Sequence, residues 1–312
     1  MNRILLLTLA IISSLNSFST SHKTPLTSDT CVYGRVFPER NDDFAWENEL
    51  VAFRAYGPKT QKNGEKSFGY DIFTKYPDKG LVLEELYGNQ CNPNNWAKID
   101  SLKKIDRKLA KDYENSFTYH IDHGKGMDCY AVGPTLGCGV PAIMARDSIC
   151  YPWCYSTIKI SYNGPDRISA TLTFNPVTIG GDTIVETRTI TLNKGSRLNY
   201  SEVSYDGISG PITVVTGFPR RKNPETFSSL QDGIIALADP TQGDSNGKIL
   251  VGLRMLNTAD SIFEKDEHTL VSTTIHPGEK LRYFWGYTWS KADIQTLSEW
   301  VEYLYRFPIE DY

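Results

Sequence analysis

The second half of the chain alternates apolar and polar residues over short segments that end at Gly, Pro or Asn clusters. The segments 168–174 and 184–192 show this most clearly, the second with threonine at positions 187, 189 and 191. Side chains of a strand point alternately to the two faces of a sheet, so each segment predicts a half-buried strand. Such short, closely spaced strands predict a mainly β fold, a large antiparallel β-sandwich with a few peripheral helices. Further strands are predicted at 198–205, 212–216, 233–238, 249–256, 270–275 and 281–289.

Two helices are expected beside the sheets. In segment 100–113, apolar residues recur at helical spacing on one stripe. Near the end of the chain, Ser290 and Asp293 have the spacing of a capping box, which predicts a helix that begins there and turns Leu297 and Leu304 inward. The segments 58–67 and 240–247 are predicted to be loops. Without an internal repeat or a linker, residues 21–312 are predicted to form a single domain.

The first twenty residues have the features of a secretory signal peptide. Arg3 precedes the apolar run Ile4 to Ile12, and small polar residues follow. That run is too short to span a bilayer, and no later segment approaches eighteen uninterrupted apolar residues. We therefore predict that residues 1–20 are a signal peptide, and that the protein is exported, periplasmic or secreted, without membrane insertion.

The charge balance excludes one class of partner. The chain has 33 Lys and Arg residues against 37 Asp and Glu, a formal net charge of −4. Nucleic-acid binding requires a basic surface, so nucleic acid is not expected as a partner.

The chain contains six cysteines, an even number. In an exported protein this favours disulfides over free thiols, although the sequence does not specify the pairing. The segment 150–154 spaces two cysteines as C-x-x-x-C, and with no second ligand pair nearby it favours a structural bridge over zinc or redox chemistry. The cysteines are Cys31, Cys91, Cys129, Cys138, Cys150 and Cys154.

The densest group of chemically active side chains lies in segment 119–139. A strand there would place His120 and Asp122 on one face, with His123 at the start of a glycine-rich turn. Asp128 and Tyr130 follow within a few residues. The alternative interpretation is structural: Asp122 caps the turn and the histidines bind backbone groups.

A second candidate group lies nearer the N-terminus. Trp46, Glu47, Arg54 and Tyr56 combine flat apolar rings with charged and hydroxyl groups, as carbohydrate-binding surfaces do. The alternative is an edge strand at 50–56 behind a solvated acidic segment. Arg188 is expected to form an ordinary surface ion pair.

Several of these segments together resemble a known family. Segments 40–48 (RNDDFAWEN), 52–58 (AFRAYGP) and 119–139, with its His-Asp-His-Gly motif, are similar to the exported bacterial family designated domain of unknown function 4861. The similarity continues through 163–165 and 191–197. It implies an exported protein encoded among polysaccharide-degradation genes, with a sandwich related to the galactose-mutarotase-like supersandwich.

The residue types permit β-elimination on uronate-containing poly- or oligosaccharides, by a lyase or a dehydratase. A base must remove the C5 proton, which is acidic only once the neighbouring carboxylate is neutralised. We expect His123 or Tyr130 as base, Tyr130 or His120 as acid and Arg54 at the carboxylate. Asp122 would orient a histidine. Trp46, Glu47, Tyr56 and Asp128 are the other expected substrate-binding residues.

Three alternatives remain open at this level. A glycoside hydrolase would need a carboxyl pair about 5 Å apart for retention or about 6.5–9.5 Å apart for inversion, drawn from Glu47, Asp122 and Asp128. A non-catalytic sugar-binding or mutarotase-like protein would need little more than stacking aromatic rings. His120, Asp122, His123 and Asp128 also have the ligand types for a divalent metal, but the histidine spacing suits a helix better than a strand, so no cofactor is assigned.

Overall fold

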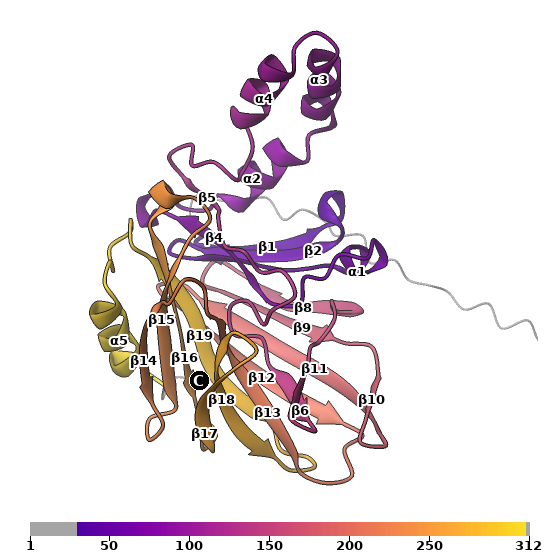
Figure 1. Cartoon of the computed structure of the whole chain (residues 1–312), viewed down its shortest axis with the longest axis vertical. Coiled ribbons are helices and arrows are strands. Elements are labelled where there is room, and N and C mark those ends of the chain that lie inside the picture. Colours follow the sequence, from indigo (N-terminus) through magenta and orange to yellow (C-terminus); the bar gives the residue numbers. More distant parts are fainter. Residues whose placement is uncertain (1–29, 310–312) are drawn as a thin grey trace, which may run out of the picture.

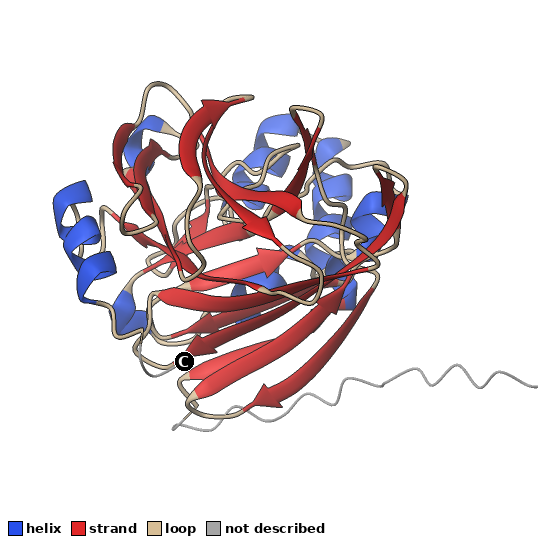
Figure 2. Ribbon diagram, turned by 90° about the horizontal axis from the view of Figure 1, so that it is seen from below, coloured by secondary structure: helices blue, strands red, loops and turns tan. Residues whose placement is uncertain are grey.

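Three antiparallel sheets account for most of the described chain. The structure is a computed structural model that describes residues 30–309, so the predicted signal peptide lies outside the described residues. The first sheet lies across one end of a larger, curved sheet, and the third sheet packs against the inner face of that larger sheet (Figures 1 and 2). The mainly β, antiparallel sandwich predicted from the alternating segments is confirmed.

The first sheet has five strands in sequence order. They are β1 (Val32–Phe37), β2 (Asp43–Asn48), β3 (Ala52–Ala55), β4 (Asp71–Lys75) and β5 (Gly126–Asp128).

The second sheet has nine strands in the order β14-β15-β16-β19-β12-β11-β9-β8, with β10 paired to β11. Its strands are β8 (Thr157–Asn163), β9 (Arg167–Thr173), β10 (Val177–Ile179), β11 (Asp182–Asn193), β12 (Leu198–Asp206), β14 (Glu225–Ser229), β15 (Ile234–Pro240), β16 (Lys248–Met255) and β19 (Leu281–Trp289).

The third sheet has five strands in the order β17-β18-β13-β6-β7. They are β6 (Ala142–Ala145), β7 (Ser148–Cys150), β13 (Ile212–Pro219), β17 (Ser261–Lys265) and β18 (His268–Ile275). All eight strands predicted from alternation are present in the second and third sheets, within a few residues of the predicted ends.

Helices cover the edges and ends of these sheets. They are α1 (Pro58–Lys62), α2 (Leu83–Gln90), α3 (Pro93–Lys103), α4 (Arg107–Asn115) and α5 (Leu297–Arg306), with short 3-10 turns η1 (Pro38–Arg40), η2 (Pro77–Lys79) and η3 (Asp244–Asn246). Among the described residues, no helix is both long and apolar enough to cross a membrane.

Both predicted helices differ from the observed ones. The single helix at 100–113 is two helices, because the Asp106 side chain accepts a hydrogen bond from Lys108 N at 2.6 Å and caps a new helix, α4. The C-terminal capping box is formed by Thr296 and Glu299, so α5 begins at Leu297. Ser290 instead accepts a hydrogen bond from Lys248 N of β16. Helix α1 occupies part of the predicted loop 58–67.

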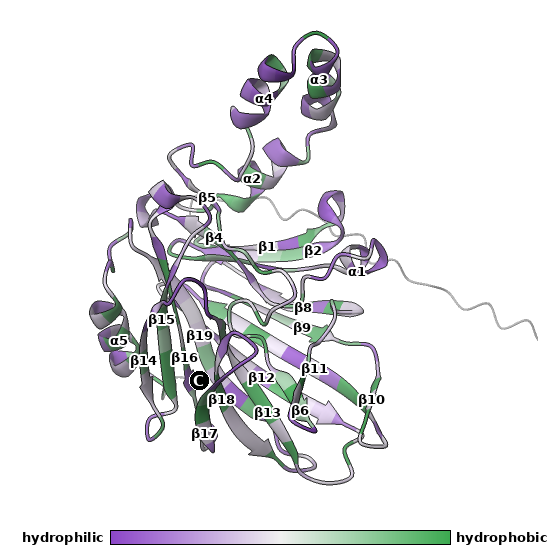
Figure 3. Ribbon diagram, in the orientation of Figure 1, coloured by the Kyte–Doolittle hydropathy of each residue, from purple (hydrophilic) through white to green (hydrophobic). Residues whose placement is uncertain are grey.

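The first sheet has one apolar face and one charged face. Phe44, Trp46 and Phe53 point toward the second sheet, where the Trp46 ring meets Trp285 edge-on at 6.3 Å between ring centroids. The opposite face lies under α2, and further out α4 is mostly hydrophilic (Figure 3). The aromatic contacts between the two sheets therefore fix the position of the first sheet on the second.

The carbohydrate platform predicted around Trp46 is therefore wrong. Trp46 and Glu47 are neighbours on one strand and so point to opposite faces of the sheet. Trp46 is fully buried, and its indole N–H donates to Asn199 Oδ1 at 2.8 Å. The segment 50–56 is likewise no edge strand, since β3 lies between β2 and β4.

We predict that Trp46→Ala lowers the free energy of unfolding by about 3–5 kcal/mol, because it leaves a cavity among buried aromatic rings. Urea denaturation measures this change. Trp96→Ala, at a position 36% exposed, is the matched control and should cost about 1 kcal/mol or less. Equal stability of Trp46→Ala and the parent chain would contradict the placement of Trp46 in the core.

Candidate functional site

The charged face of the first sheet carries an ion cluster centred on Arg54. Arg54 Nη2 lies 2.9 Å from Asp128 Oδ2 and also binds the carboxylate of Asp71, its cross-strand partner on β4. The Tyr56 hydroxyl donates to Asp71 Oδ2 at 2.7 Å. All four side chains are buried. The cluster thus holds one guanidinium between two carboxylates in a site with little water.

Asp43 adds a third carboxyl group to this cluster. Asp43 Oδ2 lies 3.9 Å from Arg54 Nη1, while its Oδ1 accepts a hydrogen bond from Gly57 N at 3.0 Å. Burial raises the pKa of Asp43 to about 6, against the lowering effect of Arg54 and Arg40. Burial, and then the negative charge of Asp71, raise the pKa of Asp128 to about 6. Perturbed carboxyl groups of this kind cluster at functional sites.

A groove of about 660 Å³ opens beside the cluster, between η1 and the ends of α2 and α3. Arg40, Trp96 and Tyr119 line it. The Tyr119 hydroxyl lies 3.4 Å from Arg54 Nη1, so this side chain joins the groove to the buried ion cluster. Arg40 Nη1 is buried and lacks a hydrogen-bond partner, which is costly for a cationic donor unless a ligand supplies an acceptor. The groove therefore offers a cation, a phenol and an aromatic ring.

His120 lies beside Tyr119, with the two rings edge to face at 4.7 Å between centroids. Its Nδ1 is 3.2 Å from the backbone oxygen of Asp128 and 3.7 Å from the Asp128 carboxylate. A carbonyl oxygen only accepts hydrogen bonds, so Nδ1 carries the proton, and neutral His120 has its lone pair on Nε2. The side chain is 55% exposed. His120 therefore presents a basic nitrogen near the surface with a carboxylate behind it.

Four predicted site residues are brought together: Arg54, Tyr56, Asp128 and His120. Arg54 does not have the predicted role, however. Its charge is balanced by Asp71 and Asp128, and its side chain is 3% exposed, so it has no free charge for a substrate carboxylate. Arg40, in the adjacent groove, is the better-placed guanidinium.

The predicted strand through His120 is wrong, because residues 118–125 form a turn after α4. Asp122 accepts hydrogen bonds from Gly124 N at 2.8 Å and Gly126 N at 3.1 Å, and caps this turn. His123 Nε2 lies 3.2 Å from the carbonyl oxygen of Thr118. The structural interpretation of these two side chains fits their contacts. Gly126 has φ +114°, and a Cβ there would meet Thr74 O at 1.8 Å, so the turn requires glycine.

Tyr130 is separated from the other predicted catalytic groups. Its ring lies 4.9 Å from the Arg221 guanidinium, and Arg221 in turn pairs with Asp239. Its hydroxyl oxygen is buried without a hydrogen-bond partner, and burial raises the pKa of Tyr130 far above its usual value. Within residues 30–309, no hydrogen bond joins Tyr130 to His120 or His123. The predicted acid and base pair is not assembled.

Glu47 has a structural role. It accepts hydrogen bonds from Val82 N at 2.9 Å and Leu83 N at 2.8 Å, at the start of α2, and pairs with Lys75 at 2.7 Å. Because Glu47 and Asp122 are occupied in this way, Glu47, Asp122 and Asp128 do not form the carboxyl pair that the hydrolase alternative requires. The four predicted metal-ligand side chains do not converge either. The described residues contain no group of three or more His, Cys, Asp or Glu side chains placed to hold a metal.

The predicted disulfides are not confirmed. Cys91, Cys129, Cys138, Cys150 and Cys154 are free thiols in the structure. Burial raises the pKa of Cys129 to about 12 and that of Cys154 to about 11, so both stay protonated near neutral pH.

The sequence interpretation assigned no site role to five residues that the structure places here, although three of them lie in its candidate segments: Arg40, Asp43, Asp71, Trp96 and Tyr119. A signal was present for Asp71, since it shares one face of β4 with Lys75 and alternates with Ile72, which packs toward the second sheet. Arg40 begins the segment 40–48 that carries the family resemblance, but no alternation marks Arg40 or Trp96, which reach the groove from segments far apart in the chain.

Comparisons with known proteins identify the family but no activity. The family described as domain of unknown function (DUF4861) matches residues 14–309. "Uncharacterized protein P7" of Formosa agariphila is 28% identical over 282 residues, which cover 88% of this chain and 66% of that protein. The chain thus spans slightly less than two thirds of the relative's length.

Solved structures resemble the chain weakly. The GH36 α-galactosidase AgaB from Geobacillus stearothermophilus has a TM-score of 0.38 at 10% identity, over 82% of this chain and 41% of that one. The α-galactosidase from Lactobacillus brevis has a TM-score of 0.34 at 11% identity, over 80% and 40%. Both TM-scores are below 0.5, so no property of these enzymes is transferred to this chain.

Proposed function

The chain belongs to the family described as domain of unknown function (DUF4861), a description that assigns no activity, and we propose its function from the groove beside Tyr119. We propose that it is a carbohydrate-active enzyme that acts on uronate-containing poly- or oligosaccharides by β-elimination. The observation that carries this proposal is the pairing of Tyr119 and His120 between Arg40, whose Nη1 has no hydrogen-bond partner, and the Asp128 carboxylate.

The groove supplies the two contacts that a uronate residue needs. Trp96 is partly exposed, and its ring is fixed by a hydrogen bond from the indole N–H to Gln90 O at 2.6 Å, so it can stack on the apolar face of a sugar. Arg40 would bind the uronate carboxylate. A guanidinium at that position neutralises the carboxylate by forming an ion pair with it, and this makes the neighbouring C5 proton more acidic.

Elimination would then use the two neighbouring rings. His120 Nε2 takes the C5 proton, and the C5–H electron pair forms the C4=C5 double bond. The C4–O bond breaks, and Tyr119 donates its proton to the departing oxygen. The leaving group is an alcohol in a lyase and water in a dehydratase. Arg40 stabilises the charge that develops on the carboxylate.

The protonation states suit these roles. Burial raises the pKa of Tyr119, against the effect of Arg54 and Arg40, so its phenol is protonated at neutral pH and can act as an acid. His120 becomes an imidazolium when it takes the proton. The Asp128 carboxylate, 3.7 Å from Nδ1, would stabilise that charge, as a carboxylate does behind a catalytic histidine.

We predict that the protein forms unsaturated products from uronate-rich polysaccharides or oligosaccharides, detected by ultraviolet absorbance. Tyr119→Phe should lower kcat by about 10²–10⁴-fold, because the general acid is lost. Arg40→Gln should lower kcat/KM by about 10²–10³-fold. Tyr113→Phe, on the exposed helix α4, is the matched control and should retain full activity.

Other outcomes distinguish the alternatives. Hydrolytic products without an absorbance change, across a broad panel of uronate glycans, would replace elimination with glycoside hydrolysis. Saturable glycan binding without turnover would support a sugar-binding protein. Full activity of Tyr119→Phe would remove Tyr119 from the mechanism.

We also predict an acidic limb in the pH profile. The active form of Asp128 is the carboxylate, which is lost as the pH falls through about 6, so kcat/KM should decline about tenfold per pH unit below that value. The Asp128→Asn variant should have a low kcat/KM at pH 8 and should not show the further decline below about pH 6. Asp112→Asn, on the exposed face of α4, should keep it. A parent profile that is flat down to pH 5 would contradict the role of Asp128.

Export belongs to the same proposal. We propose that residues 1–20 direct the chain out of the cytoplasm, on the basis of Arg3 and the apolar run that follows it. N-terminal sequencing of the protein produced in a bacterial host should give a first residue between Ser19 and Lys23. Leu6→Arg, which interrupts the apolar run, should leave the chain unprocessed. A mature protein that still begins at Met1 would overturn the assignment.

A further inference from the structure

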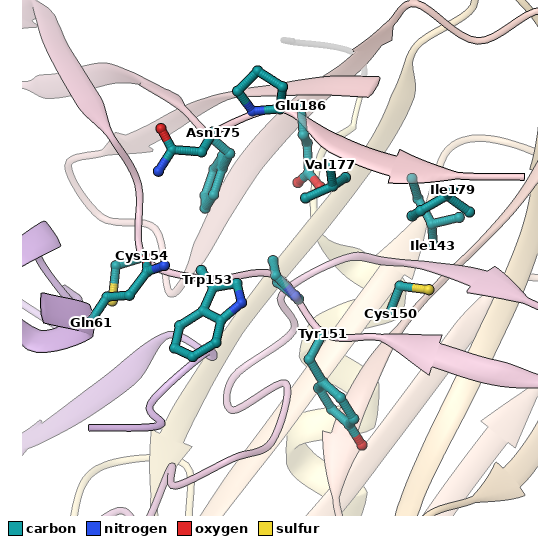
Figure 4. Close-up of a pocket in the computed structure, with 13 residues that line it drawn as sticks. Gln61, Ile143, Cys150, Tyr151, Trp153, Cys154, Asn175, Val177, Ile179 and Glu186 are labelled. Carbon is teal, nitrogen blue, oxygen red and sulfur yellow. The ribbon is translucent and has the colours of Figure 1, made fainter. Parts of the chain in front are cut away.

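A second cavity lies between the loop after β7 and strands β10 and β11 (Figure 4). Its volume is about 380 Å³, within the range of about 300–1,000 Å³ for small-molecule sites. It shares no lining residue with the groove at Tyr119. The two hollows are therefore distinct sites, and variants of one need not alter the lining of the other.

The wall formed by β11 carries a buried carboxylate. Glu186 lies on the inner face of β11, opposite Tyr151 and Trp153 across the cavity (Figure 4). Burial raises its pKa, and Arg188 Nε binds its carboxylate. The expectation that Arg188 is a surface residue is wrong, because Glu186 and Arg188 both point inward with Ile184 and Ile190.

Arg188 is held firmly in place. Its Nη2 donates to Pro141 O at 3.3 Å and its Nη1 to the Tyr70 hydroxyl at 3.4 Å, while its guanidinium lies 4.1 Å from the centroid of the Phe174 ring. The Glu186 carboxylate is therefore fixed as well, and the pair has no net charge. Such a pair favours neither an anionic nor a cationic ligand.

The opposite wall is aromatic. Trp153 is 39% exposed at the cavity rim, and Val177 across from it is 43% exposed. The Phe68 ring contacts both Tyr151, stacked at 5.6 Å, and Trp153, edge-on at 5.3 Å. These contacts support the two rim rings from behind. An exposed tryptophan on a cavity rim, supported in this way, is typical of a binding surface.

We propose that this cavity is a second carbohydrate-binding site, which takes one neutral pyranose ring with Trp153 stacked on its apolar face and Glu186 accepting hydrogen bonds from its hydroxyl groups. A purely apolar ligand would displace water from the Glu186 carboxylate without replacing the hydrogen bonds of that water, which is unfavourable. An anionic ligand would meet Glu186 as a like charge, and a cationic ligand would find the charge of Glu186 already balanced by Arg188. A neutral polyol with one apolar face can donate hydrogen bonds to Glu186 and stack on Trp153 at the same time.

Titration of the full mature chain with neutral monosaccharides and their methyl glycosides (glucose, galactose, mannose, rhamnose and xylose) tests this site. Tryptophan fluorescence and isothermal calorimetry follow binding. We expect saturable binding of at least one sugar, weakened at least about tenfold by Trp153→Ala, which corresponds to about 1.4 kcal/mol. Glu186→Gln should weaken binding too, because an amide is a poorer hydroxyl acceptor than a carboxylate.

Trp96→Ala is the control for the two sites, because it alters only the groove at Tyr119 and should leave neutral-sugar binding unchanged. Trp153 is exposed enough that its loss should leave the protein folded, so this variant remains informative even if Glu186→Gln unfolds. Binding of phenol but of no sugar, unchanged sugar affinity in Trp153→Ala, or loss of neutral-sugar binding in Trp96→Ala would each overturn the assignment.

Discussion

The packing of the first sheet on the second through aromatic side chains determines the chemistry of the other face of the first sheet. Trp46 and Phe53 meet Trp285 of β19, and Tyr70 stacks on the same ring at 4.4 Å between centroids. Once these side chains face the second sheet, the residues that alternate with them must face away. Arg54, Asp71 and Asp128 are therefore gathered beneath α2 and Tyr119, where they form the ion cluster beside the groove.

That cluster is not explained well by stability alone. Removing charges from water is costly, and apolar side chains of similar size often stabilise a protein as much as a buried ion pair does. The cluster does fix the orientation of Tyr119, through Arg54, and of His120, through Asp128. A site for acid and base chemistry needs groups held in such fixed positions. The same reasoning applies to Glu186, which Arg188 holds in place at a cavity lined mainly by aromatic and apolar side chains.

The sequence predicted the strands of the second and third sheets well, because each alternates over its own length and alternation is a local property. The sequence-based prediction was wrong where one local pattern was compatible with two different structures. The segment through His120 alternates like a strand, but Asp122 and Gly126 close it into a turn. Trp46, Glu47 and Arg54 were grouped as one surface because they are close in sequence, although strand geometry places Trp46 on the opposite face. Neither Arg40 nor Trp96 stands in an alternating pattern that would predict its position at the groove.

The sequence alone determined that this chain is a mainly β, antiparallel sandwich, because period-2 alternation forces each strand to have a buried and an exposed face. It also determined which residue types are available for chemistry, and it brought Arg54, Tyr56, Asp128 and His120 to attention. Only the tertiary structure decided which of them meet, because β5, which carries Asp128, pairs with β4 although residues 76–125 separate the two strands. The tertiary structure buries Trp46, Glu47 and Arg54, which were predicted to bind substrate. It places Arg40 and Tyr119 at the groove instead, because the burial of a side chain depends on how the sheets pack.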